Sequence, residues 1–241
     1  MICALLMAAA IYGQSDWRDL LSPGGRVVDL SGRGMFEVPV WELQPDVEVL
    51  VLDNNDLTSL PLGLAERCPN LRALSVRDNQ LIDVGMEIAG LLRLEELYLD
   101  GNDIGRLEDT GIRHLRSLRV LSLRANGMVA FNVALHQLPF LQVLWLDDNR
   151  LIKLPDLHAS PNLRELSAAN NQIDFVHAEI NRCEFLETLD LSGNRRLAGL
   201  PEELRFCDRL RIIDVSGTGI DTVPEWTDEM PDLEFFVLEE E

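Results

Sequence analysis

The chain has 241 residues, of which 46% are hydrophobic, and its formal net charge at pH 7 is -20. A chain of this length can hold one or two globular domains. Proteins that bind nucleic acids obtain their phosphate affinity from lysine and arginine, so this charge argues against a nucleic-acid partner. It also argues against binding to an anionic membrane surface, and it favours solubility.

Residues 1–25 precede the regular part of the chain. They begin with the apolar stretch MICALLMAAAIYG and continue through Trp17, Leu20 and Leu21. We interpret residues 1–25 as a capping segment whose helix covers the open end of the core. A signal peptide over residues 1–15 is the alternative, although no lysine or arginine precedes its apolar part. Because the stretch is too short to cross a bilayer, we expect no membrane span.

Residues 26–241 are predicted to form one repeat domain. The phrase LxxLxLxxNxL returns every 22–24 residues, for example as VEVLVLDNNDL at 47–57, LEELYLDGNDI at 94–104 and LQVLWLDDNRL at 141–151. A period of this length indicates one supersecondary unit that is stacked repeatedly into a solenoid with a continuous core. The chain accommodates about ten such units.

Each copy of the phrase predicts a short strand and a turn. In LEELYLDGNDI, Leu97 and Leu99 face the interior and Tyr98 faces outward, which is the alternation of a strand. The asparagine then ends the strand, and its amide can pair with turn backbone groups that would otherwise be buried without partners. This asparagine ladder contains Asn55, Asn79, Asn102, Asn126, Asn149, Asn171 and Asn194. Arg33 and Thr218 take its place at the two ends, where atypical repeats are expected.

The rest of each unit returns the chain to the next strand. A leucine–proline pair follows several turns, as at Leu154-Pro155 and Leu200-Pro201, and proline favours an extended or turn conformation there. With these features, residues 26–238 resemble leucine-rich repeat proteins. The resemblance implies an α/β solenoid in the form of a horseshoe. Its concave face would carry a parallel β-sheet, and its convex face short helical, 3-10 or extended segments. The leucine–proline pair is most similar to the intracellular Ras-group type, which implies small-GTPase or phosphatase signalling.

The cysteines favour a reducing compartment. Cys68, Cys183 and Cys207 occupy a column that holds leucine in other repeats, so we expect buried thiols that fill core positions. A disulfide between Cys183 and Cys207, which lie in neighbouring repeats, is the less favoured alternative. No asparagine begins an N-glycosylation acceptor. We therefore predict a cytoplasmic protein, with a secreted or surface protein as the alternative if residues 1–15 are a signal peptide.

Two columns of outward strand residues alternate in charge. The first contains Arg26, Glu48, Arg72, Glu95, Arg119, Gln142, Arg164, Glu187, Arg211 and Glu234, and the second contains Asp53, Arg77, Asp100, Arg124 and Asp147. Neighbouring strands lie about 4.8 Å apart, so opposite charges on them attract. We interpret both columns as ladders that fix the register of the strands. A second role in orienting a polar partner remains open.

The column between the two charge ladders supplies the predicted partner-binding site. Large side chains alternate there with small ones, at Val51, Tyr98 and Trp145. This pattern predicts an exposed apolar strip, and exposed aromatic residues beside arginine and aspartate are typical of protein-binding hot spots. The alternative is that the rings only pack over the neighbouring serines. The candidate residues are Val49, Val51, Glu96, Tyr98, Val120, Arg124, Val143, Trp145 and Asp147. Asp190 and Asp214 continue the site toward a basic flank of the partner.

The sequence contains no familiar catalytic pattern. It has no Gly-rich phosphate loop, HExxH, GxSxG or CxxC. His136 and His158 recur at one repeat position near Asp156 and could approach a zinc ion, but structural zinc sites normally need four ligands. We interpret the two histidines as facing solvent, and we expect no metal, no cofactor and no enzyme activity.

The sequence thus predicts a non-catalytic protein–protein interaction module. We expect a monomeric adaptor, or a recognition subunit in signalling, that binds a protein partner on its concave face. An extracellular recognition protein is one alternative. The regulatory segment of a larger enzyme is another, because the repeat phrase runs to Leu238 and no ordinary cap follows it.

Overall fold

The structure is a computed structural model that describes residues 22–107, 110–133, 135–157 and 160–238. The predicted capping helix and the alternative signal peptide fall on residues 1–21 and lie outside this description. So do His158 and the acidic residues 239–241.

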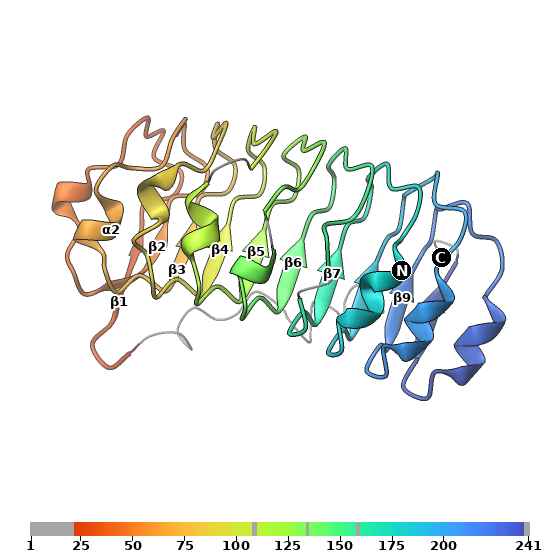
Figure 1. The fold of residues 1–241 in the computed structure, drawn as a ribbon. Helices are drawn as coiled ribbons and strands as arrows, with labels where there is room; N and C mark the ends of the chain where they lie inside the picture. Colours follow the sequence, from red (N-terminus) through yellow and green to blue (C-terminus); the bar gives the residue numbers. More distant parts are fainter. Residues whose placement is uncertain (1–21, 108–109, 134, 158–159, 239–241) are drawn as a thin grey trace.

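The described residues form ten parallel strands in one open sheet whose spatial order is the chain order. Figure 1 shows the repeats stacked side by side in an elongated row. The strands are β1 (Arg26–Asp29), β2 (Val47–Val51), β3 (Ala73–Ser75), β4 (Glu96–Tyr98), β5 (Val120–Ser122), β6 (Val143–Trp145), β7 (Glu165–Ser167), β8 (Thr188–Asp190), β9 (Ile212–Asp214) and β10 (Phe235–Val237). The predicted α/β solenoid of about ten repeats is confirmed.

Short helical turns connect most of the strands. They are η2 (Val40–Glu42), α2 (Leu64–Arg67), η3 (Met86–Ile88), η4 (Gly111–His114), η5 (Leu135–Gln137), η6 (Ala178–Arg182), η7 (Glu202–Phe206) and η8 (Glu225–Glu229). Pro201 and Pro224 have extended backbone angles and lie directly before η7 and η8. Proline therefore sets the entry to a helical turn, because its fixed φ suits that position and it has no N–H to leave unpaired.

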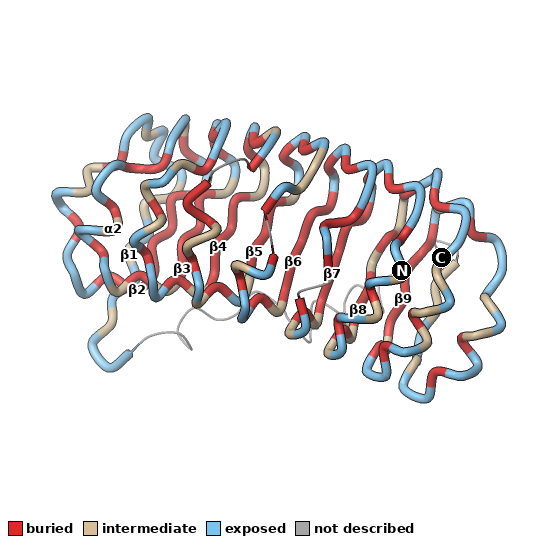
Figure 2. Tube along the Cα trace, viewed as in Figure 1, coloured by how far each residue is buried: buried red, intermediate tan, exposed pale blue. Residues whose placement is uncertain are grey.

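The core is a stack of leucines held in register by the sheet. Leu74 pairs with Leu97, Leu97 with Leu121, and Leu121 with Leu144. All four are fully buried, and each buried leucine contributes about 1.5–3 kcal/mol relative to an exposed one. Figure 2 shows this burial along the strands, with the exposed residues concentrated in the turns.

The cysteines take the core positions that the sequence predicted. Cys68, Cys183 and Cys207 are buried free thiols. Burial raises the pKa of Cys183 and of Cys207 to about 12, so both thiols stay protonated and act as small apolar groups.

The seven asparagines of the ladder make side-chain hydrogen bonds to turn backbone groups. Asn149 is representative: its side-chain amide donates to the carbonyls of Leu123 and Leu146, at 2.9 Å each, and its carbonyl accepts from the backbone N–H of Met128 at 2.9 Å. The seven asparagines are buried. Each side chain thereby joins its own turn to the preceding repeat, which leaves the buried turn backbone paired.

Candidate partner-binding face

The sheet aligns the outward residues in the columns that the sequence predicted. Val51 pairs with Ser75, Ser75 with Tyr98, and Ser122 with Trp145. The column then continues through Ser167, Asp190 and Asp214. We call the outward surface of β2–β9 the strand face.

The first charge ladder forms ion pairs between strands. Glu95 receives Arg72 from one neighbouring strand at 2.5 Å and Arg119 from the other at 3.3 Å. Further along, Arg164 pairs with Glu187 at 2.7 Å and Arg211 with Glu234 at 2.5 Å. The predicted register-fixing role is supported by this alternation of donors and acceptors.

The second ladder is more buried and has a two-repeat unit. Arg77 Nε donates to Asp100 at 2.9 Å, and Arg124 Nε donates to Asp147 at 2.6 Å. The other oxygen of Asp100 accepts from the Ser122 hydroxyl and from the Arg124 backbone N–H. Each aspartate thus joins an arginine of the preceding repeat to a serine of the following one.

The same arginines cover the aromatic rings. The guanidinium carbon of Arg77 lies 4.2 Å from the centroid of the Tyr98 ring, and that of Arg124 lies 4.2 Å from the centroid of the Trp145 ring. A cation over an aromatic face is attracted by the ring quadrupole. Arginine, aspartate and aromatic ring therefore form one repeated assembly.

The polar ends of the two aromatic side chains are bound to carboxylates. The Tyr98 hydroxyl donates to Glu96 at 2.9 Å, and Trp145 Nε1 donates to Glu165 at 2.6 Å. Buried tyrosine and tryptophan need such partners, because an unpaired donor costs free energy away from water.

The prediction of an exposed apolar strip is wrong. Tyr98 is 2% exposed and Trp145 is 7% exposed, and Val49, Val51 and Val143 are buried as well. Arginine side chains lie over the rings and hydrogen-bonded carboxylates hold their polar ends, so neither ring stands out into solvent. Val120 is half-buried.

The strip is also divided into two clusters. Val49 and Val51 pack with Ala73, whereas Tyr98 packs with Val143 and Trp145. Ser75 and Glu96 occupy the strand positions between the two groups and are too polar to join them. What the strand face presents between the ladders is therefore guanidinium groups over aromatic rings.

The face changes character from β7 onward. Asp190 is half-buried and Asp214 is buried, and each accepts the backbone N–H of a serine in its own repeat, Ser192 or Ser216, at 2.9 Å. Burial raises the pKa of Asp190 to about 6, against the opposing effect of its bonds to Ser192. The predicted acidic end is present, although its carboxylates lie deeper than the sequence suggested.

Sequence reasoning missed Glu165. Its Oε2 is buried without a hydrogen-bond partner. Burial raises the pKa of Glu165 to about 7, although the bond from Trp145 and the charge of Arg124 oppose the shift. The available signal was its strand position, which holds Val49, Val120 and Val143 in other repeats.

The described residues do not bring metal-ligand groups together. No cluster of three or more His, Cys, Asp or Glu side chains suited to a metal ion occurs among them. His136 is exposed. Within the same part of the chain, no helix is long and apolar enough to cross a membrane.

Comparison with known families identifies the repeat. A family model described as "Leucine rich repeat" matches residues 45–104 and 92–151, and a second model of the same repeat matches residues 185–207. Together these ranges cover more than half of the chain. The chain belongs to the leucine-rich repeat family, whose fold is that of a protein-binding module and typically non-catalytic.

Individual relatives are distant. Podocan of Mus musculus is 35% identical over 69 residues, which is 29% of this chain and 11% of podocan. A solved leucine-rich repeat protein of Leptospira interrogans has a TM-score of 0.79 and 26% identity, over 96% of this chain and 63% of that protein. Internalin C2 of Listeria monocytogenes has a TM-score of 0.70 and 25% identity, over 80% of this chain and 81% of that protein. The chain thus spans less than two thirds of the Leptospira protein and a small part of podocan.

Proposed function

We propose that this chain is an adaptor, or the recognition subunit of a signalling complex, and that it binds a protein partner on its strand face. The observation that carries the proposal is the pair of arginine–aromatic assemblies at Arg77–Tyr98 and Arg124–Trp145. Arginine and large aromatic residues are enriched at the energetic centres of protein interfaces.

Both arginines retain donors for a partner. Within the described part of the chain, their Nε atoms bind Asp100 and Asp147, and their terminal nitrogens have no hydrogen-bond acceptor. The side chain of Arg124 is 38% exposed and that of Arg77 is 17% exposed. A guanidinium held over a ring and fixed at Nε loses little further freedom when a partner carboxylate or carbonyl binds it.

The partner surface should therefore be polar where it meets β4–β6. It would place hydrogen-bond acceptors over Arg77 and Arg124 and a basic flank near Asp190 and Asp214. The buried residues Val49, Val51, Glu96, Val143 and Asp147 would support this surface from below rather than contact the partner. Val120, being half-buried, is the candidate apolar contact.

The cellular setting is a further part of the proposal. Free buried thiols at Cys68, Cys183 and Cys207 favour a reducing compartment. The leucine–proline pairs resemble the intracellular Ras-group repeats, which suggests a small GTPase or a phosphatase as the partner and a cytoplasmic, monomeric protein. The match to podocan and the internalin C2 fold motivate the alternative of an extracellular recognition protein.

The test compares two folded double variants in affinity capture with quantitative mass spectrometry. Arg77→Ala/Arg124→Ala removes the two guanidiniums from the strand face. Arg150→Ala/Arg182→Ala removes the same charge from two exposed positions outside that face. A partner that is retained by wild type and by the second variant, and lost by the first, supports the strand face as the binding surface.

Equal capture by all three proteins contradicts the proposal. Circular dichroism must first show that both variants keep the wild-type spectrum, since loss of the fold would remove any partner. The small-GTPase or phosphatase assignment is tested separately, by the identity of the retained protein.

A further inference from the structure

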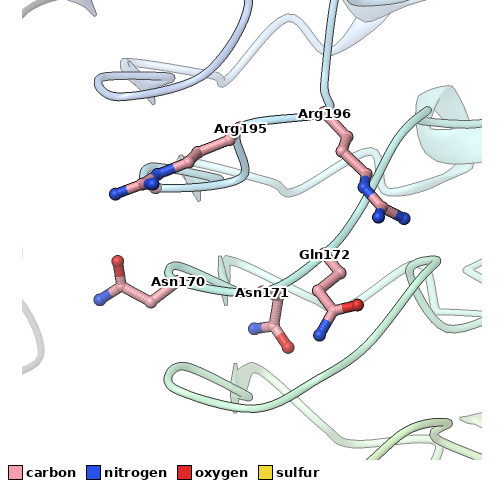
Figure 3. Close-up of a pocket in the computed structure, with 6 residues that line it drawn as sticks. Asn170, Asn171, Gln172, Arg195 and Arg196 are labelled. Atoms are coloured by element: carbon pink, nitrogen blue, oxygen red, sulfur yellow. The ribbon is translucent and has the colours of Figure 1, made fainter.

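A cavity of about 340 Å³ lies at the edge of the solenoid, where the turns after β7 and β8 meet. It is lined by Asn170, Asn171 and Gln172 from the first turn and by Gly193, Arg195 and Arg196 from the second. In Figure 3 the two arginine side chains leave adjacent positions in different directions and flank the segment Asn170–Gln172. The lining therefore combines two cationic groups with side-chain amides.

The two arginines differ from those of the strand face. Arg195 and Arg196 are exposed, and neither guanidinium forms an ion pair or hydrogen bond within residues 22–107, 110–133, 135–157 and 160–238. The strand-face arginines, such as Arg72, Arg77 and Arg124, are paired with carboxylates. The chain has a net charge of -20, whereas these two adjacent guanidiniums without carboxylate partners add positive charge at one point of its surface.

One additional residue in the repeat produces this arrangement. In the turn after β6, a single residue separates Asn149 from the next buried leucine, Leu151, whereas in the turn after β8 two residues separate Asn194 from Leu197. Leu197 still reaches the core, so the extra residue is accommodated in the turn. Arg195 and Arg196 consequently lie next to each other in the turn after β8, outside the core.

Gly193 lies close to Asn170 in the lining of the cavity. Its φ is 71°, in the left-handed region, and a Cβ there would collide with Asn170 Oδ1. The Asn170 amide donates to Asp148 at 3.0 Å, which fixes the side chain beside the cavity. The Gln172 side chain is exposed, so its amide N–H groups can supply a donor beside Arg196.

These groups select a ligand that is anionic and accepts hydrogen bonds. Guanidinium groups bind carboxylates with two parallel hydrogen bonds, and the lining contains no carboxylate to compete. A long polyanion is disfavoured, because the exposed carboxylate Asp148, in the turn after β6, accepts a hydrogen bond from the lining residue Asn170. Two arginines that point in different directions suit two neighbouring carboxylates better than one.

We propose that the Arg195–Arg196 cavity binds an acidic segment of a protein partner, with consecutive Glu or Asp side chains paired to the two guanidiniums. The site lies at the turn edge and not on the strand face, so it is an additional anchor that goes beyond the proposed function. Its charge preference is opposite to that of the acidic end at Asp190 and Asp214.

The experiment is an NMR titration of the full chain labelled with ¹⁵N. The probe is the acetylated and amidated peptide Gly-Glu-Glu-Gly, with Gly-Gln-Gln-Gly as the neutral control and inorganic phosphate as a second anion. We expect the glutamate peptide to shift the backbone amides of residues 170–172 and 193–197. Arg195→Gln/Arg196→Gln should weaken binding about tenfold or more through loss of charge-assisted hydrogen bonds, whereas Arg150→Gln/Arg182→Gln should not.

Three outcomes would overturn the proposal. The glutamine peptide could shift the same amides equally, the glutamate peptide could act undiminished on Arg195→Gln/Arg196→Gln, or phosphate alone could bind at this site. Because the titration does not involve the strand face, its failure leaves the capture experiment on Arg77 and Arg124 unaffected.

Discussion

In β4–β6, the aspartates of the second charge ladder are paired with arginine, whereas the strand carboxylates Glu165 of β7 and Asp190 of β8 have no arginine pair within the described residues. Asp100 and Asp147 each receive an arginine Nε within 2.9 Å. Glu165 has an oxygen with no partner, and Asp190 relies on Ser192 of its own repeat. Both regions have the same backbone, so the difference arises from side chains alone.

The pKa values follow this difference. Burial raises the pKa of Glu165 to about 7 and that of Asp190 to about 6. A buried carboxylate that is not paired with a cation loses hydration that one or two hydrogen bonds replace only in part. The aspartates of the second ladder in β4–β6 are thus fixed by ion pairs, whereas the buried carboxylates of Glu165 and Asp190 change their charge near neutral pH.

The largest expected loss of stability comes from removing asparagines of the ladder, and it tests whether the ladder stabilises both regions equally. Asn149→Ala in the turn after β6 and Asn194→Ala in the turn after β8 each remove a side chain that pairs several buried turn groups. We expect each to lower the free energy of unfolding by about 3–5 kcal/mol, because those groups would remain buried and unpaired. Urea unfolding followed by circular dichroism measures both. A large loss of unfolding free energy in one variant and a small loss in the other would show that the asparagine ladder does not stabilise the two regions equally.

The pH dependence of stability isolates the acidic region. Glu165 binds its proton more tightly in the folded state, so its contribution is greatest below its ordinary pKa of about 4.5 and is lost as pH rises through about 7. A shift of this size corresponds to roughly 3 kcal/mol. Asp190 should add a smaller loss between its ordinary value and about pH 6, because it is only half-buried.

Glu165→Gln should remove the contribution of Glu165 to the pH dependence of stability. We expect the variant to exceed wild type by about 1–3 kcal/mol at pH 8, and to show a flatter decline between pH 5 and 8. Unfolding in urea at a series of pH values checks this. Glu202→Gln, at an exposed glutamate of η7, is the matched control and should reproduce the wild-type slope. An unchanged slope in Glu165→Gln would mean that this carboxyl is not the titrating group.

Arg124→Gln should make the paired region resemble the acidic one. The variant loses the cation over Trp145 and the ion pair with Asp147, which we expect to cost about 1–2 kcal/mol after allowance for the partial exposure of Arg124. Arg124 also opposes the raised pKa of Glu165, so the pH at which stability declines should move upward. If neither the stability nor the pH midpoint changed, Arg124 would have no measurable electrostatic effect on Glu165.

Much of the fold and the ladder pairing could be predicted from sequence because both depend on period. The spacing of Asn149 from Asn126 and of Arg124 from Asp147 places them on adjacent turns or strands, and the sheet then brings the partners together. The exposure of Tyr98 and Trp145 could not be predicted in this way. Outward orientation is a property of the strand, whereas burial depends on whether Arg77 and Arg124 extend along the strand or fold over the rings.

The cavity at Arg195 and the unpaired oxygen of Glu165 were missed for a related reason. Both arise where a residue departs from the usual one: one additional residue before Leu197, and a carboxylate in a column that holds valine in three other strands. The period shows that such a position is unusual. Whether the break creates a cavity or a buried charge depends on neighbouring repeats, here on Gly193 with Asn170 and on Trp145 with Glu165.

The smallest expected effect concerns the far end of the first ladder. Arg211→Gln breaks the pair with Glu234, in which both side chains are more than 40% exposed. Water already solvates these charges and salt screens them, so the urea midpoint should stay within error of wild type at physiological ionic strength. Arg72→Gln, which breaks the less exposed pair with Glu95, is the matched comparison and should lower the midpoint measurably. Equal effects in both variants would show that burial does not determine how much each pair of this ladder contributes. The contrast between paired and unpaired carboxylates would then depend on geometry rather than on solvent access.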